Sequence, residues 1–305
     1  MDIVCNIDDS YTKYCVVMMT SLFENNKGED LNIHIIASDL LPANLSILSD
    51  VVEKKYSHKL YCYLVGDSLL SGFPIEDKSH ISISTYYRLF LSSILPKDLQ
   101  KVIYLDCDLL VRGSIRELWE QNVEGYAIGC VEDMWSGKAD NYSRLHYDSL
   151  FSYFNAGVLL ANLDYWRKSN FEEKALDYIR KYPERLLFND QDVLNAIFHN
   201  QKVFISFKWN MQDGFFRQKR RLRKDVWSEL DKELKCPIII HYTGSKKPWN
   251  YKSMHPYKSE YFNYLDMTRW KGERPEIDYL FYLKKILDDV FCFLSLTKPK
   301  YRKIR

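Results

Sequence analysis

The sequence predicts an α/β protein built on a single, mostly parallel, doubly wound sheet with helices on its faces. Two observations support this prediction. Short apolar runs alternate with helical patterns through roughly the first hundred residues, which is typical of parallel strands joined by helices. One of these runs then ends on two carboxylates, Asp106 and Asp108. Polar groups at the end of a strand are typical of the edge of an α/β sheet where ligands bind.

The elements of the first part follow in order along the chain. Short apolar runs, each typical of a buried strand, lie at 2–7, 31–37, 59–65 and 101–106. Helical patterns lie between them at 11–24, 42–54 and 84–95. Pro42 suits the first turn of its helix, and Pro96 follows the end of the third. The carboxyl ends of the four strands should therefore meet at one edge of the sheet.

The pattern is weaker after Asp108. Strands are expected at 126–131, 157–163 and 237–241, and helices at 171–181 and 192–198. Residues 245–275 are rich in aromatic and charged side chains and show no clear period. The chain shows neither an internal repeat nor a low-complexity linker, so we expect one catalytic domain at 1–275 followed by an appendage at 276–305.

Composition argues against several classes of protein. The formal net charge of +2 on 305 residues does not indicate a nucleic-acid partner, and none is expected. The seven cysteines include no Cys-x-x-Cys pair, which argues against a disulfide framework or a zinc site and suits a reducing compartment. No signal peptide is recognisable and no apolar stretch approaches about 20 residues, so a cytoplasmic location is expected.

Asp106, Asp108 and His241 form the leading set of candidate metal ligands, because each lies at the end of an apolar run. Two carboxylates and one imidazole suit Mn²⁺ or Mg²⁺ and leave positions open for the oxygens of a diphosphate. A solvated turn is the alternative for the two Asp, and a hydrogen-bonded core histidine is the alternative for His241. After His241, Gly244 permits close backbone approach and Lys247 offers a mobile cation, which together suggest a clamp for phosphate groups.

Polar groups also follow the first strand. Asp8 or Asp9 could hydrogen-bond a base or a ribose, and Tyr11 could stack on a base. Asp9 or Ser10 could equally cap the following helix, and one combination has Asp9 as the cap with Asp8 facing a ligand.

Two further polar segments, around Asn155 and at 188–195, could recognise sugar hydroxyls or could be Asx caps.

Two other classes of protein that carry a motif at the end of a strand fit this sequence poorly. A haloacid-dehalogenase phosphatase normally has Thr or Val where this chain has Leu110, and a Rossmann dehydrogenase needs glycines that residues 8–13 lack.

With these residues, the chain resembles the family 8 retaining glycosyltransferases, and in particular the bacterial α-galactosyltransferases of lipooligosaccharide and lipopolysaccharide synthesis. The resemblance spans roughly residues 1–250. The motifs that carry it are IVCNIDD at 3–9, HISISTYYRL at 80–89, YLDCD at 104–108, FNAGVLL at 154–160, NDQD at 189–192 and HYTGSKKPW at 241–249. Ser10 and Asn6 depart from the family, where Asn and a small residue respectively are common.

The resemblance implies a GT-A fold, with a nucleotide-sugar half at about 1–110 and an acceptor half at about 111–275. It implies a UDP-sugar donor, with UDP-galactose favoured over UDP-glucose, a lipooligosaccharide acceptor, and Mn²⁺, or alternatively Mg²⁺, held by Asp106, Asp108 and His241. Asp8, Asp9 and Ser10 would adjoin the nucleoside, and Gly244 and Lys247 would close over the phosphates. The donor sugar would contact Arg88, Asn155, Ala156 and the catalytic candidates Asp190 and Gln191. His80 and Asp133 would lie on the acceptor side.

The family chemistry is transfer with retention at the anomeric carbon. A protein nucleophile could form a glycosyl-enzyme, but the amide of Gln191, at the family position nearest the anomeric face, is a poor nucleophile. We therefore expect same-face attack through an oxocarbenium-like state. A binding protein without turnover is the alternative from another class, and the intact metal and clamp residues argue against it.

The appendage combines an amphipathic pattern at 277–296 with a basic segment at 298–305. Such a combination can bind an anionic membrane surface, so we expect peripheral association with the cytoplasmic face of the inner membrane. A helix packed on the domain is the alternative. The basic run at 217–224 could contact phosphorylated sugars of the acceptor or be a solvated loop, and the sequence does not decide between them.

Overall fold

The computed structural model describes residues 1–66, 83–276 and 278–302. A sheet of seven strands, in the order β3-β2-β1-β4-β7-β6-β8, forms its centre. The strands are β1 (Asp2–Ile7), β2 (Asn32–Ala37), β3 (Lys59–Leu64), β4 (Lys101–Leu105), β6 (Ile128–Glu132), β7 (Phe154–Asn162) and β8 (Lys202–Phe204). β7 runs antiparallel to both of its neighbours, and the other adjacent pairs are parallel. The predicted mostly parallel α/β sheet is confirmed.

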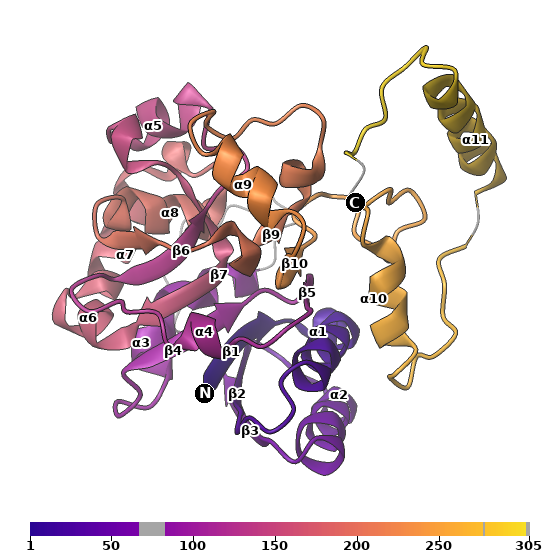
Figure 1. Ribbon diagram of the computed structural model, residues 1–305. Coiled ribbons are helices and arrows are strands. Elements are labelled where there is room, and N and C mark those ends of the chain that lie inside the picture. Colours follow the sequence, from indigo (N-terminus) through magenta and orange to yellow (C-terminus); the bar gives the residue numbers. More distant parts are fainter. Residues whose placement is uncertain (67–82, 277, 303–305) are drawn as a thin grey trace.

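Helices cover both faces of this sheet (Figure 1). Because side chains alternate along a strand, Ile3 and Ile103 enter one hydrophobic core while Val4 and Tyr104 enter the other. The first core includes α1 (Thr12–Glu24) and lies near α2 (Pro42–Ser49), which begins at Pro42 as expected. The second core is covered by α3 (Leu91–Ile94), α6 (Leu163–Lys168), α7 (Phe171–Lys181) and α8 (Asn189–Phe198).

Two predicted helices are less regular than expected. The helix at 42–54 continues from α2 into a π-helical segment, η2 (Asp50–Lys55). The helix at 84–95 is a 3₁₀ helix, η4 (Ile83–Phe90), followed by the short α3.

A second, three-stranded sheet corrects the expectation of a single sheet. It consists of β5 (Leu109–Val111), β10 (Ile239–His241) and β9 (Met211–Gln212), in the order β5-β10-β9. These strands have two or three residues each, which is too short to display a period. β10 pairs antiparallel with β5, so that His241 is opposite Leu109 and Tyr242 N donates to Asp108 O at 3.0 Å. This pairing brings the end of β10 to the acidic segment after β4.

Several short elements lack a sequence signal for the same reason. They are the helices α4 (Arg116–Trp119), α5 (Ala139–Leu145), α9 (Trp227–Glu233) and α10 (Lys258–Leu265). β7 begins at Phe154, earlier than the expected strand at 157–163, so Asn155, Ala156 and Gly157 belong to a buried strand. α8 likewise begins at Asn189 and includes Asp190 and Gln191.

The C-terminal helix α11 (Tyr279–Phe293) has no buried residue and stands away from the domain in Figure 1. Phe281 of this helix packs against Tyr251 of the domain, with ring centroids 5.7 Å apart. The chain then returns, and Tyr301 pairs with Arg217 in an isolated antiparallel bridge. No helix in the described part of the chain combines the length and the apolar character needed to cross a bilayer.

Candidate functional site

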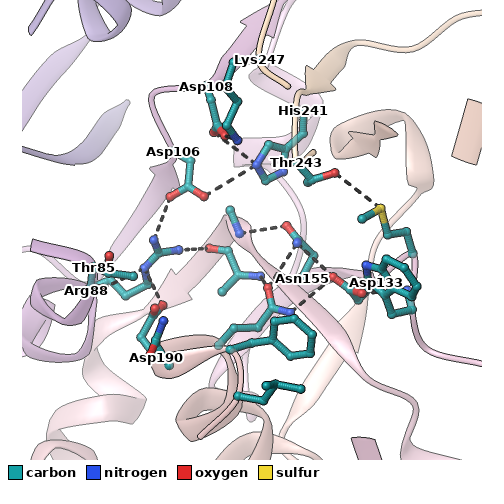
Figure 2. A pocket seen from close by; sticks show the side chains of 18 residues that line it. Thr85, Arg88, Asp106, Asp108, Asp133, Asn155, Asp190, His241, Thr243 and Lys247 are labelled. Atoms are coloured by element: carbon teal, nitrogen blue, oxygen red, sulfur yellow. Dashed lines mark hydrogen bonds and ion pairs between the residues drawn. The ribbon is translucent and has the colours of Figure 1, made fainter. Parts of the chain in front are cut away.

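A cleft of about 530 Å³ opens beyond the carboxyl end of β4. Its side chains come mainly from β7, α8, η4, the segment between β4 and β5 and the segment after β10, and Figure 2 shows the labelled ones pointing toward one another. The lining residues are Thr85, Arg88, Asp106, Asp108, Asp133, Met134, Trp135, Asn155, Ala156, Gly157, Leu187, Phe188, Asn189, Asp190, Gln191, His241, Thr243 and Lys247. Ten of the predicted site residues are therefore brought to one cavity.

Asp106, Asp108 and His241 lie together at the top of this cleft (Figure 2), with candidate ligand atoms within 4.8 Å of one another. His241 Nε2 is 3.3 Å from Asp108 Oδ1 and 3.7 Å from Asp106 Oδ2. The three residues come from the end of β4, the start of β5 and the end of β10. Two carboxylates and an imidazole around one point are a donor set that fits a hard divalent cation.

The orientation of His241 is fixed by Asn210, which the sequence analysis did not identify, and through it by Asn155. Asn210 Oδ1 lies 2.9 Å from His241 Nδ1 and can only accept, so Nδ1 carries the proton and Nε2 presents its lone pair to the carboxylates. Asn210 in turn donates to Asn155 Oδ1 at 2.8 Å. Such a hydrogen bond on the second ring nitrogen is typical of metal-binding histidines.

Gly157 is a second residue whose part in the site was missed. A Cβ added there would lie 2.1 Å from His241 Cε1 and 2.7 Å from Asp106 Oδ2. Its carbonyl also accepts a 2.9 Å hydrogen bond from Asp106 N. Only glycine therefore permits this approach of β7 to the cluster, and a glycine inside a strand is the signal that could have revealed it.

Arg88 contacts both a candidate metal ligand, Asp106, and a residue proposed to contact the donor sugar, Asp190. This buried guanidinium donates to Ala156 O at 2.7 Å, and it lies 2.9 Å from Asp106 Oδ1 and 2.8 Å from Asp190 Oδ2. Burial raises the pKa of Asp190 to about 7, because the desolvation outweighs the opposing effect of Arg88. Asp190 is thus an acid that titrates near neutrality inside the cleft.

Lys247 contacts Asp108 directly and also donates to Tyr242 O at 2.7 Å. Burial alone would raise the pKa of Asp108, but Lys247 and His241 hold it well below its ordinary value. Asp108 is therefore ionised at neutral pH. Lys247 and a cation would compete for the same carboxylate, which suits a lysine that moves to phosphate oxygens when a ligand enters.

Gln191 is fully occupied by hydrogen bonds on the floor of the cleft. Its Oε1 accepts from Asn155 Nδ2 at 3.2 Å and Ala156 N at 3.0 Å, and its Nε2 donates to Asp133 Oδ2 at 3.3 Å and Tyr153 OH at 3.1 Å. Asp133 is buried, and this burial raises its pKa. Gln191 therefore ties β7 to the segment that begins at Asp133.

The group after β1 does not line the cleft, although β1 adjoins β4 in the sheet. Asp8 is the N-cap of η1 (Asp9–Tyr11): its Oδ1 accepts from Tyr11 N at 3.1 Å and from Ser10 Oγ at 2.5 Å. The alternative with Asp9 as the cap is wrong, because Asp8 is the residue with the extended backbone that a cap requires. Asp9 Oδ1 instead accepts from Leu41 N at 2.7 Å.

Two remaining candidates stand apart from the cleft lining. Gly244 follows the cleft residue Thr243, and a Cβ there would meet nothing closer than Asp213 at 3.5 Å. No neighbour in the described structure therefore requires glycine at this position. His80 lies outside the described residues.

Comparison with known proteins gives consistent results. Residues 2–253 match the family described as glycosyl transferase family 8. General stress protein A of Bacillus subtilis (strain 168) is 30% identical over 88% of this chain and 94% of its own length. A lipopolysaccharide 1,2-glucosyltransferase of Escherichia coli is 28% identical over 96% of this chain and 89% of its own length. The crystal structure of the galactosyltransferase LgtC, in complex with donor and acceptor sugar analogues, superposes with a TM-score of 0.79 at 25% identity, covering 88% of this chain and 96% of that one.

Proposed function

This chain belongs to glycosyltransferase family 8 and is a hexosyltransferase with the GT-A fold, and from that premise we propose that it moves a hexose from a UDP-sugar to a terminal sugar of lipooligosaccharide or lipopolysaccharide. The observation that carries the proposal is the cluster of Asp106, Asp108 and His241 in the same cleft as Arg88 and Gln191. A cation site that adjoins a hydrogen-bonding floor suits a sugar diphosphate, whose two ends need different partners.

Mn²⁺ is the proposed cation, with Mg²⁺ as the alternative. The residues fit it: an ionised Asp108, a second carboxylate, and an imidazole whose free Nε2 faces both of them. When bound, such a cation neutralises the charge of the diphosphate and of the departing UDP. Lys247 holds a phosphate oxygen on the side opposite the cation. Gly244 allows the segment from 244 to 247 to close over the diphosphate. Asp8, Asp9 and Ser10, after the neighbouring strand, hold the nucleoside.

The donor sugar lies over the floor formed by Arg88, Asn155, Ala156, Asp190 and Gln191. The oxygen and both N–H hydrogens of the Gln191 amide are already engaged, which supports a positioning role over attack on the anomeric carbon. We therefore favour same-face attack by the acceptor hydroxyl through an oxocarbenium-like state, which gives retention. Asp133 and His80 orient the acceptor.

Galactose is the proposed hexose, and glucose is the rival. LgtC, a galactosyltransferase, superposes on 88% of this chain. The Escherichia coli relative, described as a glucosyltransferase, is slightly more similar in sequence at 28% identity. The two sugars differ only at the C4 hydroxyl, so the donor must be measured directly.

We also propose that α11 attaches the enzyme to the cytoplasmic face of an anionic inner membrane, where a lipid-linked acceptor would be found. The helix exposes apolar side chains along its whole length; the most exposed are Tyr279, Leu280, Phe293 and Leu296 just beyond it. Lys284, Lys285 and Lys298 supply positive charge beside them. Apolar insertion combined with basic residues is the pattern of peripheral attachment.

The decisive experiment measures hydrolysis of UDP-galactose, UDP-glucose and UDP-N-acetylglucosamine with Mn²⁺, with Mg²⁺ and with a chelator. We expect cation-dependent turnover that is fastest with UDP-galactose. Fastest turnover of UDP-glucose would replace the donor but keep the reaction class. UDP-sugar binding without hydrolysis, and without transfer to any lipooligosaccharide, would instead indicate a binding protein.

A further inference from the structure

The basic run at 217–224 is anchored at the rim of the cleft. Gly137 N donates to Arg221 O at 2.8 Å, and Arg223 N donates to Ser136 Oγ at 3.4 Å. A Cβ at Gly137 would lie only 2.6 Å from Arg221 O, so the close approach of these two segments depends on that glycine. The run therefore packs against the residues that follow Asp133.

A small hollow lies between these two segments. It is lined by Met134, Trp135, Gly214, Arg217, Lys219 and Arg221. Met134 and Trp135 also line the main cleft. The hollow therefore adjoins the cleft at the two residues that follow Asp133, and its lining does not include the carboxylates or Lys247 proposed to serve the diphosphate.

Acids in the described part of the chain neutralise several cations of the run, but not Lys219 and Arg221, which line the hollow. Arg220 lies 2.5 Å from Asp231, and Arg223 lies 2.9 Å from Asp225. Lys219 and Arg221 are exposed, and neither has an acidic partner among the described residues.

Further cations crowd the same rim. Arg217 contacts Asp213, yet its Nε is buried without a hydrogen-bond partner. The backbone of Lys300 joins this rim, because Gln218 N donates to Lys300 O at 3.1 Å. Burial, reinforced by Arg217, lowers the pKa of Lys300. Positive charge is therefore in excess on this side of the cleft.

Trp135 completes the hollow. Arg221 and Lys138 lie over its ring, at 4.4 Å and 4.1 Å from the centroid. The indole fixes these cations by cation–π contact and leaves the outward donors of Arg221 available. A guanidinium with free donors binds the oxygens of a phosphate or a carboxylate in pairs.

We propose that this hollow binds an anionic substituent, a phosphate or a carboxylate, on the acceptor glycan, so that the enzyme selects charged acceptors over neutral ones. The inference rests on the proposed transferase function, because it assigns the hollow to the acceptor of that reaction. The donor diphosphate is accounted for by a different set of residues. An acceptor sugar over Asp133 would place its substituent beside Trp135, where Lys219 and Arg221 have no other partner.

The test uses binding, so that it does not depend on turnover. The full chain, with UDP and Mn²⁺, is titrated by calorimetry or ligand-observed NMR with glucose, glucose 6-phosphate and glucuronic acid, and with the corresponding galactose set. We expect the charged sugars to bind roughly tenfold more tightly than the neutral ones at low salt. The double variant Lys219→Gln, Arg221→Gln should reduce this ratio to about two or less. Lys224→Gln, in the same run but outside the hollow, should keep it.

Equal affinity of the wild type for charged and neutral sugars would overturn the inference. So would a charge preference that survives the double substitution. A double variant that loses only sedimentation with phosphatidylglycerol vesicles, with its sugar preference unchanged, would reassign the hollow to lipid headgroups. UDP-sugar hydrolysis in the wild type is measured in parallel, because its absence would contradict the proposed reaction whether or not the hollow discriminates by charge.

Discussion

Asp108 is a central residue of the candidate cation site. It is ionised, contacts Lys247, and lies 3.3 Å from His241. We predict that Asp108→Asn lowers UDP-hexose turnover by on the order of 10²- to 10³-fold, because it removes a fixed charge from the preorganised site. The measurement is steady-state turnover with saturating Mn²⁺, accompanied by circular dichroism to verify the fold.

The matched control is Asp177→Asn, which removes an exposed carboxylate from α7 and should leave turnover unchanged. Wild-type turnover in Asp108→Asn would exclude the proposed cation site. Lost turnover together with a lost circular dichroism spectrum would mean that Asp108 serves the fold instead.

Asp190 gives the cleft a pH dependence whose sign follows from its environment. Its pKa rises from 3.8 in the unfolded chain to about 7 in the fold, so the folded protein binds this proton more tightly. The stabilising contribution of the proton is therefore present below about pH 4 and is lost as the pH rises through 7. We predict that, relative to Asp190→Asn, the wild type loses on the order of 1 kcal/mol of stability per pH unit across this window.

Urea denaturation of both proteins at several pH values between 4 and 8 measures this difference. A constant difference across the window would show that Asp190 is not the titrating group. The comparison of slopes is informative even if the substitution shifts both curves, because Asn cannot ionise.

The single residues also show what sequence reasoning could reach. Asp106, Asp108 and His241 could be associated because each ends an apolar run, and strand ends of an α/β sheet meet at one edge. Asn210 and Tyr153 could not, because nothing in a one-dimensional pattern indicates which amide or hydroxyl will face an imidazole or a glutamine. Their roles depend on side-chain directions that are set only when β7, β9 and α8 pack together.

At the scale of elements, length decided what could be predicted. β1 and β4 are apolar runs of five or six residues and α7 has a helical pattern of eleven, and their observed bounds agree with the expected ones within one residue. β5, β9 and β10 have two or three residues. Their pairing depends on contacts between distant segments: Leu109 is opposite His241, and Met211 is opposite Ile240. The strand at 237–241 was expected and matches β10, but its pairing with β5 and β9 into a small sheet could not be predicted from the sequence.

The approach of β7 to the end of β10 leads to a third prediction. A Cβ at Gly157 would overlap His241 Cε1, so Gly157→Ala must displace the imidazole or the strand. We predict that Gly157→Ala weakens Mn²⁺-dependent binding of UDP at least about tenfold, because a misplaced ligand loses most of its contribution to a metal site. Titration calorimetry of UDP with and without Mn²⁺ measures this effect.

Gly129→Ala is the matched control, since Gly129 lies in β6 and its added Cβ would approach Val123 no closer than 3.3 Å. A mild loss of stability with normal UDP binding is expected there. Normal Mn²⁺-dependent binding by a folded Gly157→Ala protein would show that the position of His241 is not critical.

At the scale of the whole molecule, the two-faced sheet, the cleft at its edge and the detached α11 form three separate parts. The order β3-β2-β1-β4 of neighbouring strands follows from right-handed crossovers between parallel strands. The sequence pattern could predict this part of the sheet. The antiparallel insertion of β7 between β4 and β6 could not be predicted, because a fully buried strand shows an unbroken apolar run in either direction.

The exposed helix leads to the last prediction. Leu280 and Leu283 are 80% and 57% exposed on α11, and an apolar surface of this kind outside the core marks an interaction site. We predict that Leu280→Gln, Leu283→Gln lowers sedimentation with vesicles containing phosphatidylglycerol several-fold, because each buried leucine contributes about 1.5–3 kcal/mol to insertion. Leu150→Gln, at a position 82% exposed elsewhere on the domain, should leave sedimentation unchanged.

If removal of residues 277–305 also left binding to these vesicles unchanged, the helix would have a different partner. Size-exclusion chromatography with light scattering would then test a second copy of the chain, because two such helices could cover each other's apolar side chains.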